Sequence, residues 1–238
     1  LVIGMRALSF SAQAAGEEDE QMTKKEIAMT ILFALVLASI LFIVIPTGAA
    51  HLAAAYTDDP IVFNLIEGGI RLMVFLLYIW GISFMGGIRR VFQYHGAEHK
   101  TIHCYEAGEA LTVENVQKFP RLHPRCGTNF LLIVMVVAIV FHVFFGWPDI
   151  WLRILSRLAI LPVVAGVSYE IIRFAGRSEN HFVHILITPG LWLQYLTTRP
   201  PADEMVEVAI ESLKAVLPAE DIPAGSGNYR NEQKETTC

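Results

Sequence analysis

The sequence predicts an all-α fold, namely a polytopic membrane protein with about four transmembrane helices. Hydrophobic residues make up 54% of the 238 residues, and only 17% are charged. Soluble domains have about a quarter of their residues charged, so this balance indicates a lipid environment. The net charge of −5 and the lack of a long basic run argue against nucleic acid as a partner. The first partner that we expect is therefore the lipid bilayer.

Four apolar stretches approach the length of about 20 residues that a transmembrane helix needs. They lie near residues 27–45, 61–88, 130–147 and 150–169. The first stretch is preceded by Thr23 and Glu26, a spacing that is typical of a capping box at a helix start. Pro46 follows its last residue and favours an end there.

Charged residues interrupt two of these stretches. Glu67 and Arg71 are four residues apart near the start of the second, so we expect them to form an ion pair on one helix face. Arg153 and Arg157 lie in the fourth stretch, which makes it the weakest of the spans. We expect these two arginines to extend toward the near membrane interface while their stems remain in lipid.

The predicted domains are an N-terminal amphipathic segment, a membrane domain, a cytoplasmic amphipathic helix and a disordered tail, at residues 1–22, 23–200, 201–217 and 218–238. The chain begins with Leu1, so we expect its natural start to be missing. Residues 185–196 are apolar but too short to cross a membrane, and Pro189 interrupts them. They predict an interfacial or re-entrant segment.

Basic residues are concentrated in one loop. The connection from residue 86 to 127 contains six lysines and arginines, whereas the connection from 46 to 60 contains none and includes Asp58 and Asp59. Basic loops of membrane proteins face the cytoplasm. We therefore expect a multi-pass plasma-membrane protein whose middle loop and both termini are cytoplasmic.

The middle loop contains the string YHGAEHKTIHCYE, which is dense in metal-binding side chains. In a helix, the rotation of about 100° per residue places His95, His99 and His103 on one face. Glu98 and Glu106 project from the same face. The string HGAEH also fits the H-x-x-E-H signature of inverted zinc peptidases. Glu98 is then the candidate catalytic base, which accepts a proton from water at the metal.

Two further clusters lie on the same predicted side of the membrane. His123 and Cys126 are three residues apart around a proline, and His181 and His184 can share a helix face. Cys104 points away from the histidine face and fits an apolar, space-filling role. Nitrogen ligands combined with sulfur or carboxylate favour zinc over magnesium or calcium. The candidate zinc ligands are His95, His99, His103, His123, Cys126 and His184.

With these motifs in view, the chain resembles the YqhQ-like family of bacterial multi-pass membrane proteins. The resemblance extends from Leu1 to Leu217 and rests on YHGAEHKTIHCYE, LHPRCGTNF, the RFAGR and ENH region, and the PGLWLQ stretch. HPRCGT is an unusual string, and the ordered combination is more specific still. The resemblance implies a metal-dependent enzyme of unknown function and implies no particular substrate.

Three functions fit these observations. The leading one is a zinc-dependent hydrolase in which His95 and His99 bind the metal and Glu98 is the base. The second is a non-enzymatic scaffold or assembly factor, whose zinc holds the middle loop while the C-terminal helix docks a membrane or cytoplasmic protein. The third is a transporter, which at four spans requires dimerisation and is supported only by charged or titratable groups near the membrane, Glu67, Arg71, His142 and Glu170. A homo-oligomer is compatible with all three.

Overall fold

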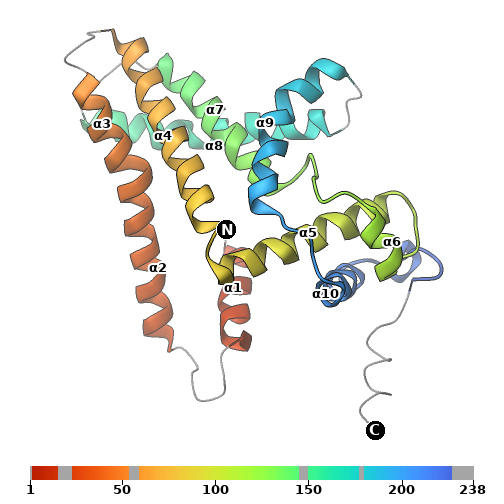
Figure 1. The fold of residues 1–238 in the computed structure, drawn as a ribbon. Coiled ribbons are helices and arrows are strands. Elements are labelled where there is room, and N and C mark those ends of the chain that lie inside the picture. Colours follow the sequence, from red (N-terminus) through yellow and green to blue (C-terminus); the bar gives the residue numbers. More distant parts are fainter. Residues whose placement is uncertain (1, 16–22, 54–58, 145–149, 177–179, 227–238) are drawn as a thin grey trace.

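The computed structural model describes residues 2–15, 23–53, 59–144, 150–176 and 180–226. Every regular element in these ranges is a helix, which confirms the all-α prediction (Figure 1). The elements are α1 (Val2–Ala15), α2 (Lys24–Ser39), η2 (Ile40–Val44), α3 (Ile45–Ala53), α4 (Pro60–Ile82), α5 (Gly86–Glu106), α6 (Val113–Lys118), α7 (Gly127–Val143), α8 (Ile150–Ala175), α9 (His181–Thr197), α10 (Asp203–Lys214) and η3 (Ala219–Asp221).

Three of the described helices are long and apolar enough to cross a membrane, at Lys25–Leu52, Pro60–Ile82 and Leu155–Ala175. The first combines α2, η2 and α3 into one continuous rod, and most of its apolar side chains are exposed, as expected of a surface that faces lipid. The predicted capping box is present. The side chain of Thr23 accepts the backbone N–H of Glu26, and the backbone N–H of Thr23 donates to the carboxylate of Glu26 at 2.7 Å. α7 is equally apolar but has only 17 residues, so the span that we expected near residues 130–147 stays a prediction.

The second span ends six residues earlier than we predicted. The hydroxyl of Ser83 donates to the carbonyl of Trp80 at 2.7 Å, and the helix stops there. α5 begins at Gly86, after a short turn. Residues that the sequence assigned to a membrane helix therefore begin the helix that carries the histidines.

A buried ionic cluster ties the membrane helices together. Glu67 in α4 is almost completely inaccessible and pairs with Arg71 at 2.6 Å, as predicted. Arg157 in α8 donates both guanidinium nitrogens to the same carboxylate, at 2.9 and 2.8 Å. This pairing of Arg157 with a carboxylate of another helix was not foreseen from the sequence. The side chain of Arg153 lies outside the described residues.

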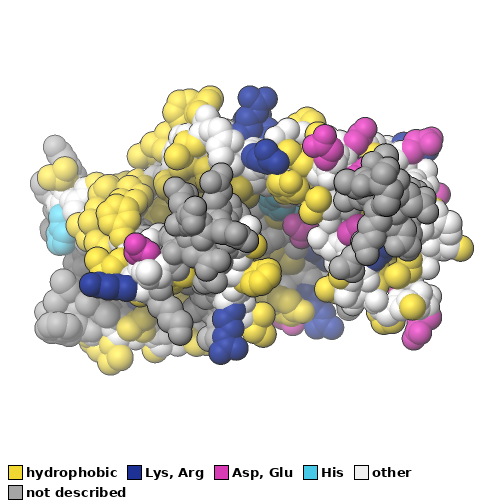
Figure 2. All heavy atoms as spheres, turned by 90° about the horizontal axis from the view of Figure 1, so that it is seen from below, with side chains coloured by type: hydrophobic (Ala, Val, Ile, Leu, Met, Phe, Trp, Pro, Cys, Tyr) yellow, Lys and Arg dark blue, Asp and Glu magenta, His cyan; other side chains and the backbone are white. Residues whose placement is uncertain are grey.

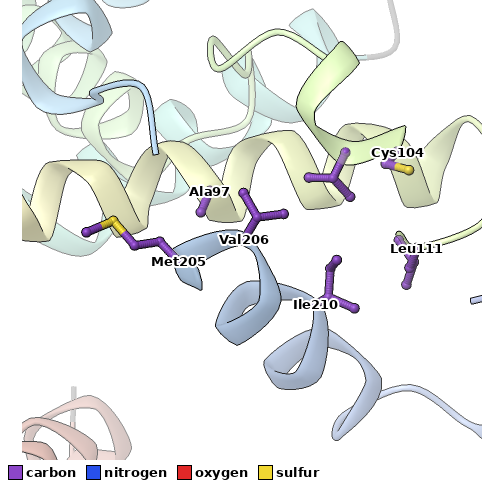
Figure 3. Close-up of a cluster of buried hydrophobic side chains, with 7 residues drawn as sticks. Ala97, Cys104, Leu111, Met205, Val206 and Ile210 are labelled. Carbon is purple, nitrogen blue, oxygen red and sulfur yellow. The ribbon is translucent and has the colours of Figure 1, made fainter. Parts of the chain in front are cut away.

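α5, α6 and α10 form a separate unit that lies to one side of the membrane helices (Figure 1). Ala97 and Cys104 of α5 pack against Val206 and Ile210 of α10, all of them buried (Figure 3). Cys104 therefore has the space-filling role that we expected. Acidic side chains gather on the part of this face that the unit forms, whereas yellow apolar patches lie on the part that the membrane helices form (Figure 2). This contrast matches one part in water and one in lipid.

The C-terminal third connects the two parts. α9 is a continuous helix that contains the predicted interfacial segment, and its Gly190 lies directly against Asn129 of α7. Beyond α10, residues 218–226 form η3 and a turn whose Ser226 accepts the backbone N–H of Leu111 at 2.9 Å. The remainder of the predicted tail lies outside the described residues.

Candidate metal centre

The candidate ligands project from α5, which is closely approached by the segment after α9. A side chain at Gly96 would overlap the carbonyl oxygen of Arg199. The N–H of Arg199 donates to the carbonyl of Phe92 at 2.8 Å, which fixes this approach. Glycine weakens an isolated helix by about 1 kcal/mol relative to alanine. Here it lets the end of α9 reach the helix, and Thr197 comes to lie beside His95.

The loop between α6 and α7 covers the histidine face of α5. The ammonium group of Lys100 donates to the carbonyls of Gln117 and Phe119, at 2.8 and 2.7 Å. On the other side, the amide of Gln194 in α9 accepts the N–H of His123 at 2.8 Å and donates to its carbonyl at 2.7 Å. Both partners are buried. These bonds hold the loop in place from two helices.

Three of the predicted ligands converge on one point. One ligand atom from each of His95, His99 and Cys126 lies within 4.8 Å of the other two. Nε2 of His95 is 3.2 Å from Sγ of Cys126. In a tetrahedral zinc site, with Zn–N of about 2.1 Å and Zn–S of about 2.3 Å, nitrogen and sulfur ligands lie about 3.6 Å apart. The spacing of this group therefore fits zinc after small shifts.

Backbone carbonyls determine which nitrogen of each ring faces the group. Nδ1 of His95 lies 2.8 Å from the carbonyl oxygen of Thr197, and Nδ1 of His99 lies 2.6 Å from that of Arg121. A carbonyl can only accept, so Nδ1 carries the proton in each neutral ring and Nε2 keeps its lone pair. Histidines that bind metals typically donate their second N–H to such a partner. Nε2 is thus the nitrogen of each ring that would bind a metal, and binding would displace any proton that Nε2 of His95 shares with Cys126.

The electrostatics of the group favour a thiolate. Burial raises the pKa of Cys126, but hydrogen bonds with His95, His99 and Thr128 outweigh burial and lower the pKa to about 5. Burial lowers the pKa of His95. The hydrogen bond between His95 and Cys126 and the attraction between their charges outweigh burial, so the pKa of His95 is raised. The thiolate is the form of cysteine that binds zinc. Cys126 is therefore already in the required state at neutral pH.

A second group lies beside the first. One ligand atom from each of His103, Glu106 and His123 lies within 4.8 Å of the other two. Nε2 of His103 is 2.9 Å from the carbonyl oxygen of Leu122, which leaves Nδ1 of the neutral ring with its lone pair. Nε2 of His123 is 3.4 Å from Glu106, whose other oxygen pairs with Arg125. Burial and the neighbouring His103 lower the pKa of His123 to about 4, so its ring is neutral at physiological pH.

Two predicted site residues lie apart from these groups. Glu98 is exposed and, within the described part of the chain, belongs to neither of them. It lines a groove of about 640 Å³ between α5 and α10, together with His95. His184 lies in α9, but its side chain is outside what the structure describes. Glu106 belongs to the second group, but it was not named as a ligand from the sequence. Its position seven residues after His99, on the same helix face, is the signal that could have identified it.

The comparisons with known proteins agree on one family. The family model described as "Protein of unknown function (DUF1385)" matches residues 1–219. The chain is 38% identical over 229 residues to the "Uncharacterized protein YqhQ" of Bacillus subtilis (strain 168), an alignment that covers 90% of this chain and 72% of that protein. No solved structure matches the chain.

Proposed function

The chain belongs to the DUF1385 family of proteins of unknown function, and we propose that it is a zinc-dependent hydrolase of the membrane surface. His95, His99 and Cys126 would hold the metal. One observation carries the proposal: two imidazoles whose Nδ1 atoms face backbone carbonyls meet a cysteine whose pKa is lowered to about 5. Two imidazole nitrogens and a thiolate within 4.8 Å of one another form a donor set that suits a zinc ion.

The number of ligands favours catalysis over a structural role. Structural zinc sites use four protein ligands, whereas catalytic sites use three and leave one position open. Among the described residues, the group contains three. The loop is also held by hydrogen bonds that need no metal, from Lys100 and Gln194. A zinc ion is therefore not required to hold the loop in place.

Glu98 is the proposed proton acceptor. Zinc, when bound, supplies Lewis-acid activation of water and of a substrate carbonyl or phosphoryl oxygen. Glu98 and His95 line the same groove, and we place the reacting water in this groove, between the carboxylate and the metal. The carboxylate would take the proton from this water and return it to the leaving group. Most other lining residues are apolar, including Val91 and Leu213, which suits a substrate with an apolar segment.

Cobalt substitution tests the metal site. Cobalt bound to a thiolate gives a near-ultraviolet charge-transfer band that imidazole and carboxylate ligands do not give. We expect the band in the wild-type protein and its loss in Cys126→Ser. The matched control is Cys104→Ser, since Cys104 is buried in the α5–α10 core and should not affect the band. A wild-type spectrum without the band removes Cys126 from the site.

Glu98→Gln tests catalysis. Glutamine preserves the shape of the side chain but does not accept the proton. In complementation of a strain that lacks the gene, the variant should retain its metal and fold and lose function. Glu114→Gln, which changes an exposed carboxylate on α6, should behave as the wild type. A fully functional Glu98→Gln variant would contradict the hydrolase and favour the scaffold, for which α10 exposes Val208 to a protein partner.

The orientation that we propose places the metal centre on the cytoplasmic side of the plasma membrane, with α7 crossing the membrane in addition to the three longer spans. It rests on the excess of basic residues between residues 86 and 127. The transporter loses its main support, because Glu67 is saturated by Thr47, Arg71 and Arg157 and acts as a tie between helices.

A further inference from the structure

We propose that His103, Glu106 and His123 bind a second metal ion, so that the chain carries a two-metal centre. The inference deepens the proposed function and depends on it, because the second ion would lie beside the first. From the sequence, the candidate zinc ligands formed one set, namely His95, His99, His103, His123, Cys126 and His184. Among the described residues, the geometry forms two groups of three, and each group has its own set of mutually close ligand atoms.

The two groups are neighbours along one row of imidazole rings. The ring centroids of His95 and His99 are 4.4 Å apart, and those of His103 and His123 are 4.6 Å apart. Between the groups, the rings of His99 and His123 are separated by 5.7 Å. Two ions held by these adjacent rings would be neighbours, as the paired ions of two-metal hydrolases are.

The second group has the features of a ligand set. The carbonyl of Leu122 orients His103 through Nε2 and leaves Nδ1 with its lone pair, so the two nitrogens have the opposite roles to those at His95 and His99. His123 would bind through Nε2 after releasing the proton that this nitrogen directs toward Glu106. The carboxylate of Glu106 supplies negative charge, and its partner Arg125 is half exposed, so the group is accessible from solvent. Two nitrogens and one carboxylate without a thiolate make a harder donor set than the first group. Such a set accepts zinc, manganese or ferrous iron.

A one-metal alternative assigns Glu106 a different task. Nδ1 of His123 accepts the backbone N–H of Arg125 at 3.2 Å, and Nε2 lies 3.4 Å from Glu106. In this alternative Glu106 only orients His123, and any metal belongs to the first group. The two readings differ in the number of ions per chain and in the effect of removing the Glu106 carboxylate.

A cobalt titration of metal-free full-length protein separates the two readings. The thiolate-to-cobalt band reports only on the site that contains Cys126, whereas the visible ligand-field absorption reports on both. We expect the visible absorption to continue rising after the thiolate band has saturated, to a total of two ions per chain. Both signals reaching saturation together at one ion per chain would overturn the second site while leaving the proposed function intact. A protein that binds no cobalt would end both proposals.

Glu106→Gln identifies the second site. The variant should bind one ion and keep the full thiolate band, which also shows that the fold and the first site survive. Glu109→Gln is the matched control, because Glu109 is an exposed carboxylate three residues away that belongs to neither group. His103→Gln should reproduce the loss of one ion. Two ions retained in both Glu106→Gln and His103→Gln would refute the assignment of these residues.

Discussion

Replacing Gln194 with leucine tests whether α9 positions the metal-binding loop. The side chain of Gln194 is fully buried and makes two hydrogen bonds to the backbone of His123, at 2.8 and 2.7 Å. Leucine has a similar volume but leaves one buried N–H and one buried carbonyl without a partner. Each unsatisfied group costs about 1–3 kcal/mol, so we expect a loss of about 2–6 kcal/mol in the free energy of unfolding.

The same change should weaken metal binding. Cys126 follows His123 by three residues, so a loosened loop shifts a ligand of the first group. Loss of a partner that orients a ligand typically reduces metal affinity by about 10–100-fold. Thermal unfolding in detergent, with and without added zinc, measures both effects.

Gln93→Leu is the matched control for Gln194→Leu. Gln93 also donates its amide to a backbone carbonyl, that of Pro200, but through one exposed bond of 3.3 Å. A change at such a position alters stability by less than about 0.5 kcal/mol. If Gln194→Leu and Gln93→Leu unfold at the same temperature and bind zinc equally well, α9 does not position the loop.

Two further predictions concern the cysteines and the topology. In metal-free protein that carries Cys238→Ser, alkylation of Cys126 should follow a pH profile with a midpoint of about 5, since its pKa is lowered to that value, whereas burial raises the pKa of Cys104 above its ordinary range. Mass spectrometry of the alkylated peptides measures both profiles, and a Cys126 midpoint above pH 8 would contradict the thiolate. In intact cells, an impermeant thiol reagent should label a cysteine at Asp59 and spare one at Lys118. Labelling of Lys118→Cys alone would invert the proposed orientation.

The helices were predictable because their signals are local. Apolar runs of sufficient length identify the membrane helices, and Thr23 with Glu26 forms the capping box that its spacing indicates. The ion pair of Glu67 with Arg71 was predictable for the same reason, because the two residues are four positions apart in one helix. The histidine face of α5 follows from the same helical rotation. These features depend on residues within one or two turns of each other.

The features that the sequence did not reveal depend on distant residues. Arg157 was expected at the interface, but its partner is 90 residues away in the chain. Gly96 looked like a weak point of a helix until Arg199 was placed against it. The division of the ligands into two groups depends on where the α6–α7 loop crosses α5, which side-chain spacing alone does not specify. Glu106 lies close to His123 of this loop and belongs to the second group, whereas Glu98 belongs to neither group.

The zinc content of the purified protein tests the central claim most directly. Full-length protein prepared without chelators should contain at least one zinc per chain by elemental analysis, and His99→Ala should lose most of the ion bound by His95 and Cys126. The loss is expected because two of three ligands bind zinc far more weakly than three. Wild-type protein that contains no metal and takes up none would contradict the account, as would a His99→Ala variant with unchanged zinc.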